Sequence, residues 1–162
     1  MESVSVEIVQ TQMLVDKHNL NRFLEAQVTS YEVAMLELAR GRKESHWIWY
    51  IFPQIEGLGR SDTAKLYFIK SLEEGRAYLE HPVLGQRLIE ACEIILSLKD
   101  VSMDEVMGFP DDLKLLSSMT LFEALSDSSS IFTKIIEIYF DGERDEASLE
   151  IIKTMHLSPD IF

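Results

Sequence analysis

Apolar residues recur at helical spacing over most of the chain. Between Leu20 and Leu38 they fall on one face of a helix, and Gly41 follows as a stop signal. The sequence has no series of alternating strands joined by hairpin turns. The pattern predicts an all-α fold, a compact single-domain bundle of about six or seven helices. The members of the first helical face are Phe23, Leu24, Gln27, Tyr31, Ala34, Met35 and Leu38.

Residues that can cap a helix mark several of the expected starts. Ser71 with Glu74, and Ser102 with Glu105, follow the capping-box pattern, in which a serine and a glutamate three residues later satisfy free amides. Pro82 suits a first helical position. Further candidate caps are Ser61, Asp145 and the serines before Ile131.

The first 18 residues do not share the helical pattern. Val4, Val6 and Ile8 alternate with polar residues, so residues 1–18 are expected to form an N-terminal extension, either a loose tail or a short strand. The extension lacks the basic and apolar regions of a secretory signal. No Pro-, Gly- or Ser-rich run divides the remainder, so residues 19–162 are expected to form one helical domain.

The segment from Asp111 to Leu125 is apolar on nearly every side when drawn as a helix, which predicts that it is buried. It nevertheless contains Lys114 and three hydroxyl residues, and a buried polar group without a partner costs roughly 1–3 kcal/mol. One interpretation is that Asp111 or Asp112 pairs with the lysine while the hydroxyls bond to carbonyls four residues earlier. The other is that these groups line a cavity. The hydroxyl residues are Ser117, Ser118 and Thr120.

Residues 46–61, HWIWYIFPQIEGLGRS, combine aromatic side chains with a glycine-broken loop. The apolar run from Trp47 to Phe52 is far shorter than the roughly 20 residues that span a bilayer, which excludes a membrane partner. It is either a short helix that ends before Pro53 or an extended segment. Its rings belong either to the core or to the wall of a ligand site, with the glycines letting a backbone approach closely.

The charge of the chain limits its partners. There are 28 acidic residues against 15 basic ones, a net charge of −13, and phosphate-rich nucleic acid binds basic surfaces, so nucleic acid is not expected. Residues 40–61, in contrast, carry four basic and two acidic residues. A small anion would meet least repulsion there, close to free amides at a helix that begins near Ser61.

Metal and cofactor chemistry has no support in the sequence. The four histidines are far apart, without metal-ligand spacing, and neither a metal nor a cofactor is expected. Cys92 lies in an apolar helical pattern and is expected to be a buried structural thiol. The cytoplasm is the expected compartment. His46 is the candidate for proton transfer, because histidine is the side chain whose unperturbed pKa is closest to neutral pH.

The motifs together resemble a known family. The segments RFLEAQVTSYEVAMLELARGRKESHWIWYIFPQIEGLGRS, RAYLEHPVLGQRLIE and GFPDDLKLLSSMTLFEAL are similar to the family catalogued as domain of unknown function 1810, over about residues 19–153. Proteins of this family are often labelled calpastatin. The resemblance implies a compact, mainly α-helical domain and supplies no catalytic residues. A calpain inhibitor is a flexible chain that folds on its target, so protease inhibition is not expected of this apolar, periodic sequence.

Two functions of different classes follow from these observations. The first is binding of a small anionic ligand, phosphate- or nucleotide-like, between the aromatic segment with its glycine loop and the buried polar helix. The alternative is a helical protein–protein interaction module without catalytic activity, anchored by exposed aromatic side chains. The candidate ligand-binding residues are Gln27, Tyr31, Arg42, Lys43, His46, Trp47, Trp49, Gln54, Gly57, Gly59, Arg60, Ser61, Lys114, Ser117 and Ser118.

Overall fold

The computed structural model describes residues 16–156, and they form an all-α fold without a sheet. Most of the predicted extension, residues 1–15, lies outside the described residues. The described helices are α2 (Asn21–Ala39), α3 (Ile48–Ile51), α4 (Asp62–Tyr67), α5 (Leu72–Glu80), α6 (Leu84–Ser97), α7 (Met103–Met107), α8 (Asp111–Ala124), α9 (Ile131–Tyr139) and α10 (Glu146–His156).

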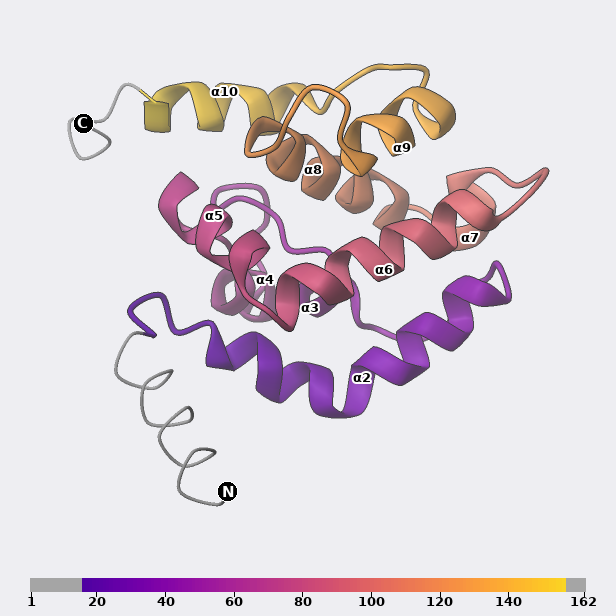
Figure 1. Ribbon diagram of the computed structural model, residues 1–162, viewed down its shortest axis with the longest axis horizontal. Coiled ribbons are helices and arrows are strands. Elements are labelled where there is room, and N and C mark those ends of the chain that lie inside the picture. Colours follow the sequence, from indigo (N-terminus) through magenta and orange to yellow (C-terminus); the bar gives the residue numbers. More distant parts are fainter. Residues whose placement is uncertain (1–15, 157–162) are drawn as a thin grey trace.

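The helices are arranged in three layers (Figure 1). α2 forms one outer layer, α5 and α6 run through the middle with α3 and α4 behind them, and α8 to α10 form the other outer layer. α7 lies at the end of the molecule where α6 turns toward α8. The middle layer therefore has helices on both sides, which explains the buried apolar face of α6.

Side chains of the predicted type cap most of the helices. The hydroxyl groups of Ser61, Ser71, Ser102 and Ser130 each accept a hydrogen bond from the amide three residues later, as a helix N-cap does. Asp145 does the same for Ser148 in α10. The capping residues in the sequence thus gave correct helix starts at these five positions.

One predicted start needs a correction. Pro82 is not the first residue of a helix, because α6 begins at Leu84. The side chain of His81 accepts hydrogen bonds at Nδ1 from the amides of Val83 and Leu84, at 3.1 and 3.2 Å. His81 thus satisfies free amides at the start of α6, and Pro82 lies in the turn that this histidine closes.

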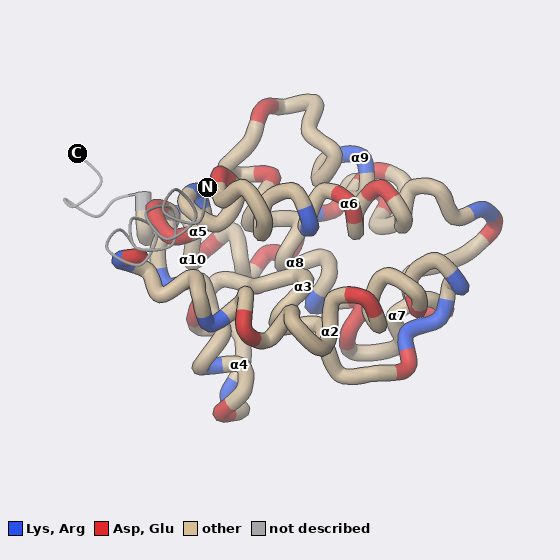
Figure 2. Tube along the Cα trace, turned by 60° about the horizontal axis from the view of Figure 1, so that its bottom comes forward, with Lys and Arg blue, Asp and Glu red and all other residues tan. Residues whose placement is uncertain are grey.

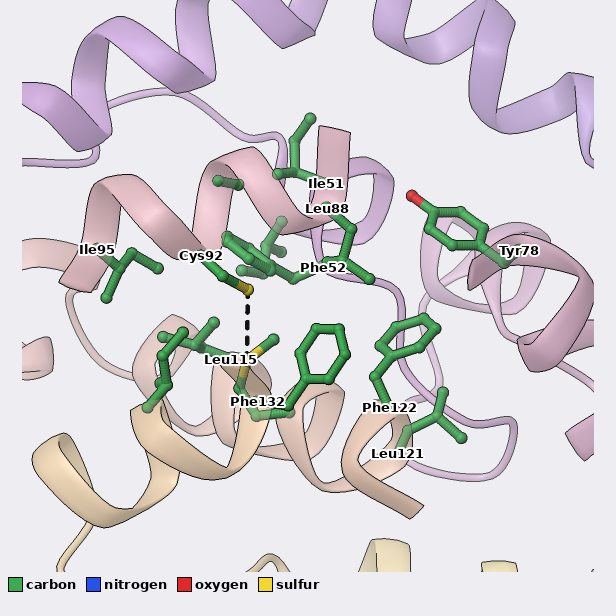
Figure 3. Close-up of a cluster of buried hydrophobic side chains, with 14 of the residues drawn as sticks. Ile51, Phe52, Tyr78, Leu88, Cys92, Ile95, Leu115, Leu121, Phe122 and Phe132 are labelled. Atoms are coloured by element: carbon green, nitrogen blue, oxygen red, sulfur yellow. Dashed lines mark hydrogen bonds between the residues drawn. The ribbon is translucent and has the colours of Figure 1, made fainter. Parts of the chain in front are cut away.

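The core is centred where α6 faces α8 and α9 (Figure 3). Phe52, from the end of the aromatic segment, is fully buried among these helices. The Cys92 thiol lies 3.8 Å from the Met119 sulfur, and burial raises the pKa of Cys92. A thiol with a raised pKa holds little thiolate and is a poor nucleophile, so Cys92 contributes packing to the fold.

α8 carries more buried residues than any other described helix. Leu115 and the six consecutive residues Ser117–Phe122 are all buried. It contacts α5, α7, α9, α10 and α3, so it has neighbours on nearly all sides. This burial confirms the prediction made from its all-round apolar pattern.

We expect the central amides of α8 to be the slowest in the protein to exchange with deuterium. Exchange there requires separation of several packed helices, whereas amides at exposed helix ends open locally. Hydrogen–deuterium exchange followed residue by residue by NMR checks this. Faster exchange in residues 117–121 than in the outer helix α2 would contradict it.

None of the helices in residues 16–156 combines the length and apolarity that crossing a membrane requires.

Candidate functional site

The segment after α2 folds around a buried carboxylate. Glu37 is only 4% exposed, and its Oε1 accepts hydrogen bonds from the amides of Glu44 and Ser45 and from the Trp47 indole, at 2.8, 2.9 and 2.8 Å. Its Oε2 accepts a bond from the Ser45 hydroxyl at 2.6 Å. Burial alone would raise the pKa of Glu37, but these hydrogen bonds outweigh it and lower the pKa to about 2. The ionised carboxylate therefore fixes the path of residues 44–47.

Two lysines meet at one aspartate beside this segment. Lys43 places its Nζ 2.7 Å from one carboxylate oxygen of Asp111, and Lys114 places its Nζ 3.3 Å from the other. The Lys43 side chain is 5% exposed and that of Lys114 31% exposed. Lys43 also donates to the Ser45 carbonyl. The inner ammonium is thus enclosed, while the outer one reaches solvent.

Each lysine lies over a tryptophan ring. The Nζ atoms of Lys43 and Lys114 are each 5.0 Å from a ring centroid, that of Trp47 and that of Trp49 respectively. Trp47 is fully buried, whereas Trp49 is half-buried. A cation this close to an aromatic face is attracted by the ring electrons. We call Lys43, Trp47, Trp49, Asp111 and Lys114 the lysine–tryptophan cluster.

The polar groups of α8 have different partners. Ser117 and Thr120 donate to the carbonyls four residues earlier, at 3.1 and 2.8 Å, as the local interpretation predicted. Ser118 is 0% exposed, and its Oγ has no hydrogen-bond partner within the part of the chain that the structure describes. Ser118 lies one turn beyond Lys114 on α8.

The glycine loop lies away from the two lysines of the lysine–tryptophan cluster. Lys43 lies beside α7, because its backbone amide donates a hydrogen bond to the Val106 carbonyl. Ser61, in contrast, is the N-cap of α4. α4 and α7 are well separated along the long axis of the molecule in both Figure 1 and Figure 2. The structure therefore does not bring residues 57–61 to the two lysines. One of the amides at the start of α4 is occupied, because Ala64 donates to the Ser61 hydroxyl.

The loop itself is packed against its neighbours. Ile55 is fully buried and pairs with Ile69 in an isolated parallel bridge. The backbone carbonyl of the buried Gln54 accepts a hydrogen bond from the Ile69 amide. A β-carbon on Gly57 would lie 3.2 Å from the Ile151 side chain, and one on Gly59 would lie 3.3 Å from Ala64 and Phe68. These glycines permit close packing of the loop against α4 and α10.

Gln27 and Tyr31 belong to a second group of polar side chains, between α2 and α6. Gln27 is 2% exposed and donates to the Tyr50 carbonyl at 2.8 Å, while its Oε1 accepts a bond from Arg87 at 3.1 Å. Tyr31 donates to a carboxylate oxygen of Glu90 and stacks under Arg87. We call these side chains the arginine–tyrosine group. Trp49 of the lysine–tryptophan cluster directly precedes Tyr50, whose carbonyl accepts from Gln27.

The remaining candidates lie on the surface. Arg42, His46 and Arg60 are exposed. Among residues 16–155, His46 has no hydrogen-bond or ion-pair partner that would orient its ring for proton transfer. The same part of the chain contains no group of three His, Cys, Asp or Glu side chains that could hold a metal ion. Arg42 directly precedes Lys43 in the chain, and Figure 2 shows basic positions in the segment beside α7.

Comparison with known proteins places the chain in a family. The family described as "Protein of unknown function (DUF1810)" matches residues 17–152. The chain belongs to the DUF1810 family. The crystal structure of the conserved hypothetical protein Rv1873 from Mycobacterium tuberculosis matches this DUF1810 chain with a TM-score of 0.83 and 42% identity, over 85% of this chain and 99% of that one. No curated protein matches the chain.

Sequence reasoning missed two residues that organise this DUF1810 domain. Glu37 has a visible signal, since it lies three residues after Ala34 and next to Leu38 on the buried face of α2. A carboxylate on an apolar face is rarely buried unless it is paired. Arg87 was not among the candidates, and its contact with Gln27 joins residues 60 positions apart. No periodicity within α6 reveals such a contact.

Proposed function

We propose that the chain binds a small anionic ligand, phosphate- or nucleotide-like, at the outer face of the lysine–tryptophan cluster. The observation that carries the proposal is that two ammonium groups share one carboxylate, that of Asp111. The members of the cluster carry two positive charges and one negative charge, and the Glu37 carboxylate bonded to Trp47 adds a second negative charge. The two neighbouring ammonium groups, and not a net positive charge, are therefore what would receive an anion in a chain whose net charge is −13. Lys114 is the more exposed of the two lysines, and its ammonium has three N–H donors, of which Asp111 takes one.

Two neighbouring groups support a ligand with an anionic and a flat part. Trp49 is half-buried, so part of its ring is open to stacking by a base or similar ring. The buried hydroxyl of Ser118, one turn beyond Lys114 on α8, has no partner among residues 16–155, at a cost of roughly 1–3 kcal/mol. Buried unsatisfied groups of this kind occur where a ligand or water completes the hydrogen bond. The glycine loop has no part in this proposal.

The test is the melting temperature of the purified protein in the presence of inorganic phosphate, nucleoside monophosphates, dinucleotides and sugar phosphates. A ligand at about 100 times its dissociation constant stabilises the folded state by roughly 2.7 kcal/mol. For a chain of this length, that corresponds to a rise of about 5–11 °C. Binding should weaken as salt is added, since Lys114 is partly exposed and its charge is screened.

Lys114→Met is expected to abolish the ligand-induced shift while leaving a folded protein. Methionine keeps the apolar length of the side chain over Trp49, and Asp111 still pairs with Lys43. The matched control is Lys134→Met on α9, which removes an exposed charge far from the cluster in sequence. An equal loss of the shift in both variants would mean that net charge, and not this site, controls binding. Unchanged melting temperatures with every probe would reject the proposal.

One observation favours the alternative, a helical interaction module. Phe109 is 75% exposed and Leu113 is 47% exposed, and they lie four residues apart at the start of α8. Exposed aromatic side chains beside charged ones are common anchors of protein interfaces. Binding of a partner protein that persists at high salt and is lost in Phe109→Ser would favour this alternative over the anionic ligand.

A further inference from the structure

Arg87 of α6 is held in position from two sides. Its Cζ lies 4.5 Å from the centroid of the Tyr31 ring, and one terminal nitrogen donates a 3.1 Å hydrogen bond to Gln27. Gln27 is itself fixed, because its Nε2 donates to the Tyr50 carbonyl and, at 3.3 Å, to the Tyr78 hydroxyl. A guanidinium fixed in this way loses little rotamer entropy on binding a ligand.

Most donors of the Arg87 guanidinium are not used by the protein. A guanidinium has five N–H donors. Within residues 16–155, the guanidinium of Arg87 makes one hydrogen bond, the one to Gln27, and it takes part in no ion pair. Arg22 provides the contrast, since it donates to four backbone carbonyls and to Glu74. Arg87 is also partly exposed, so its free donors are accessible.

We infer that Arg87 is the anchor of a second binding site, which takes a carboxylate group. The planar fork of a guanidinium matches a carboxylate through two parallel hydrogen bonds. Glu90 lies on the same face of α6, one turn from Arg87, and its oxygens accept bonds from Tyr31 and from Gln86. Its negative charge opposes any second anion, and it opposes a dianion more strongly than a monoanion. A carboxylate therefore fits the site better than a phosphate.

This inference is independent of the ligand proposed for the lysine–tryptophan cluster. The two sites use different cations, Arg87 and Lys114, on different helices. Lys114→Met should leave the carboxylate site intact, and changes at Arg87 should leave the phosphate-induced shift intact. Failure of either proposal can therefore be recognised without reference to the other.

The experiment is a titration of the full chain with sodium benzoate, followed by the side-chain Nε–H resonances of the arginines in nitrogen–proton NMR spectra. Saturable movement of the Arg87 resonance is expected at millimolar benzoate, with inorganic phosphate producing a weaker response at the same concentration. The exposed Arg76 of α5 is the internal reference and should not saturate. An Arg87 resonance that moves no more than that of Arg76 would overturn the inference.

Glu90→Gln provides a test that does not remove the anchor. Glutamine can still accept the Tyr31 hydroxyl bond, but the repulsion of the ligand is removed. Benzoate affinity is expected to rise several-fold, and phosphate affinity to rise by more, so that the preference for carboxylate narrows or reverses. Arg87→Gln removes the reporting resonance, so both variants and the parent are also followed by the side-chain amide resonances of Gln27, which Arg87 contacts. In Arg87→Gln these resonances should no longer respond to benzoate or phosphate, and retention of the native fold is checked by the backbone amide spectrum. Unchanged affinities in Glu90→Gln would show that Glu90 does not set the preference and would overturn the choice of ligand.

Discussion

Arg22→Met is expected to lower the free energy of unfolding by about 3–5 kcal/mol, because it removes one partner of a buried ion pair. Arg22 lies 2.6 Å from the Glu74 carboxylate, and the two side chains are 10% and 4% exposed. The arginine also donates to the carbonyls of Leu66 and Phe68, which flank the end of α4. Without it, the Glu74 charge and these carbonyls lose their partner together. The segment from α4 to α5 should detach from α2 first.

A neighbouring ion pair supplies the control for this prediction. Lys17 and Glu73 are 2.8 Å apart, but their side chains are 66% and 65% exposed. Solvent screens such a pair, so Lys17→Met should leave the melting temperature nearly unchanged. Arg22→Met should lower it by on the order of 10 °C for a chain of this size. Thermal unfolding followed by circular dichroism compares the two variants directly. Similar shifts in both would contradict the assigned role of burial.

The features predicted correctly from the sequence are local ones. The apolar face of α2, the burial of α8 and the serine caps depend on residues three or four positions apart, which a helix brings together whatever the rest of the chain does. The number of helices was underestimated, because nine are present in residues 16–156 against six or seven expected. α3, α4 and α7 have only four to six residues, too few for a periodic apolar pattern to appear.

The arrangement of the candidate site depends on contacts between distant parts of the chain. Trp47 and Trp49 are two residues apart, yet one is enclosed in the core and the other reaches solvent. Trp47 directly precedes the short helix α3, whereas Trp49 lies within it. Lys43 meets Asp111 because α7 brings the start of α8 to the segment after α2. The glycine loop was assigned to the same site through sequence proximity, and its packing against α10 could not be inferred from spacing.

The residue that ties the lysine–tryptophan cluster to the fold is Glu37, and its replacement by glutamine tests this. In Glu37→Gln the remaining carbonyl oxygen can still accept from Ser45 and Trp47, and the Ser45 hydroxyl can rotate to accept from the new amide. The substitution therefore removes the charge with little change of shape. The pKa of Glu37 falls from an ordinary 4.5 to about 2 on folding, a difference that corresponds to about 3 kcal/mol of stability.

The sign of the pH dependence follows from that lowered pKa. The contribution of Glu37 is fully present above pH 4.5 and is lost as the pH falls through about 2, because the folded state must then take up a proton at a site built for the anion. Glu37→Gln should thus be less stable than the parent by about 3 kcal/mol at pH 7, and by less than half of that at pH 3. Urea unfolding at both pH values measures the difference. Glu32→Gln, on the exposed side of α2, is the control and should show neither effect.

A difference in the free energy of unfolding between Glu37→Gln and the parent that stays constant from pH 7 to pH 3 would contradict this prediction. It would mean that the charge of Glu37 does not hold residues 44–47. In that case the anchoring of Lys43 beside Asp111 would have to come from the hydrogen bond between its amide and Val106.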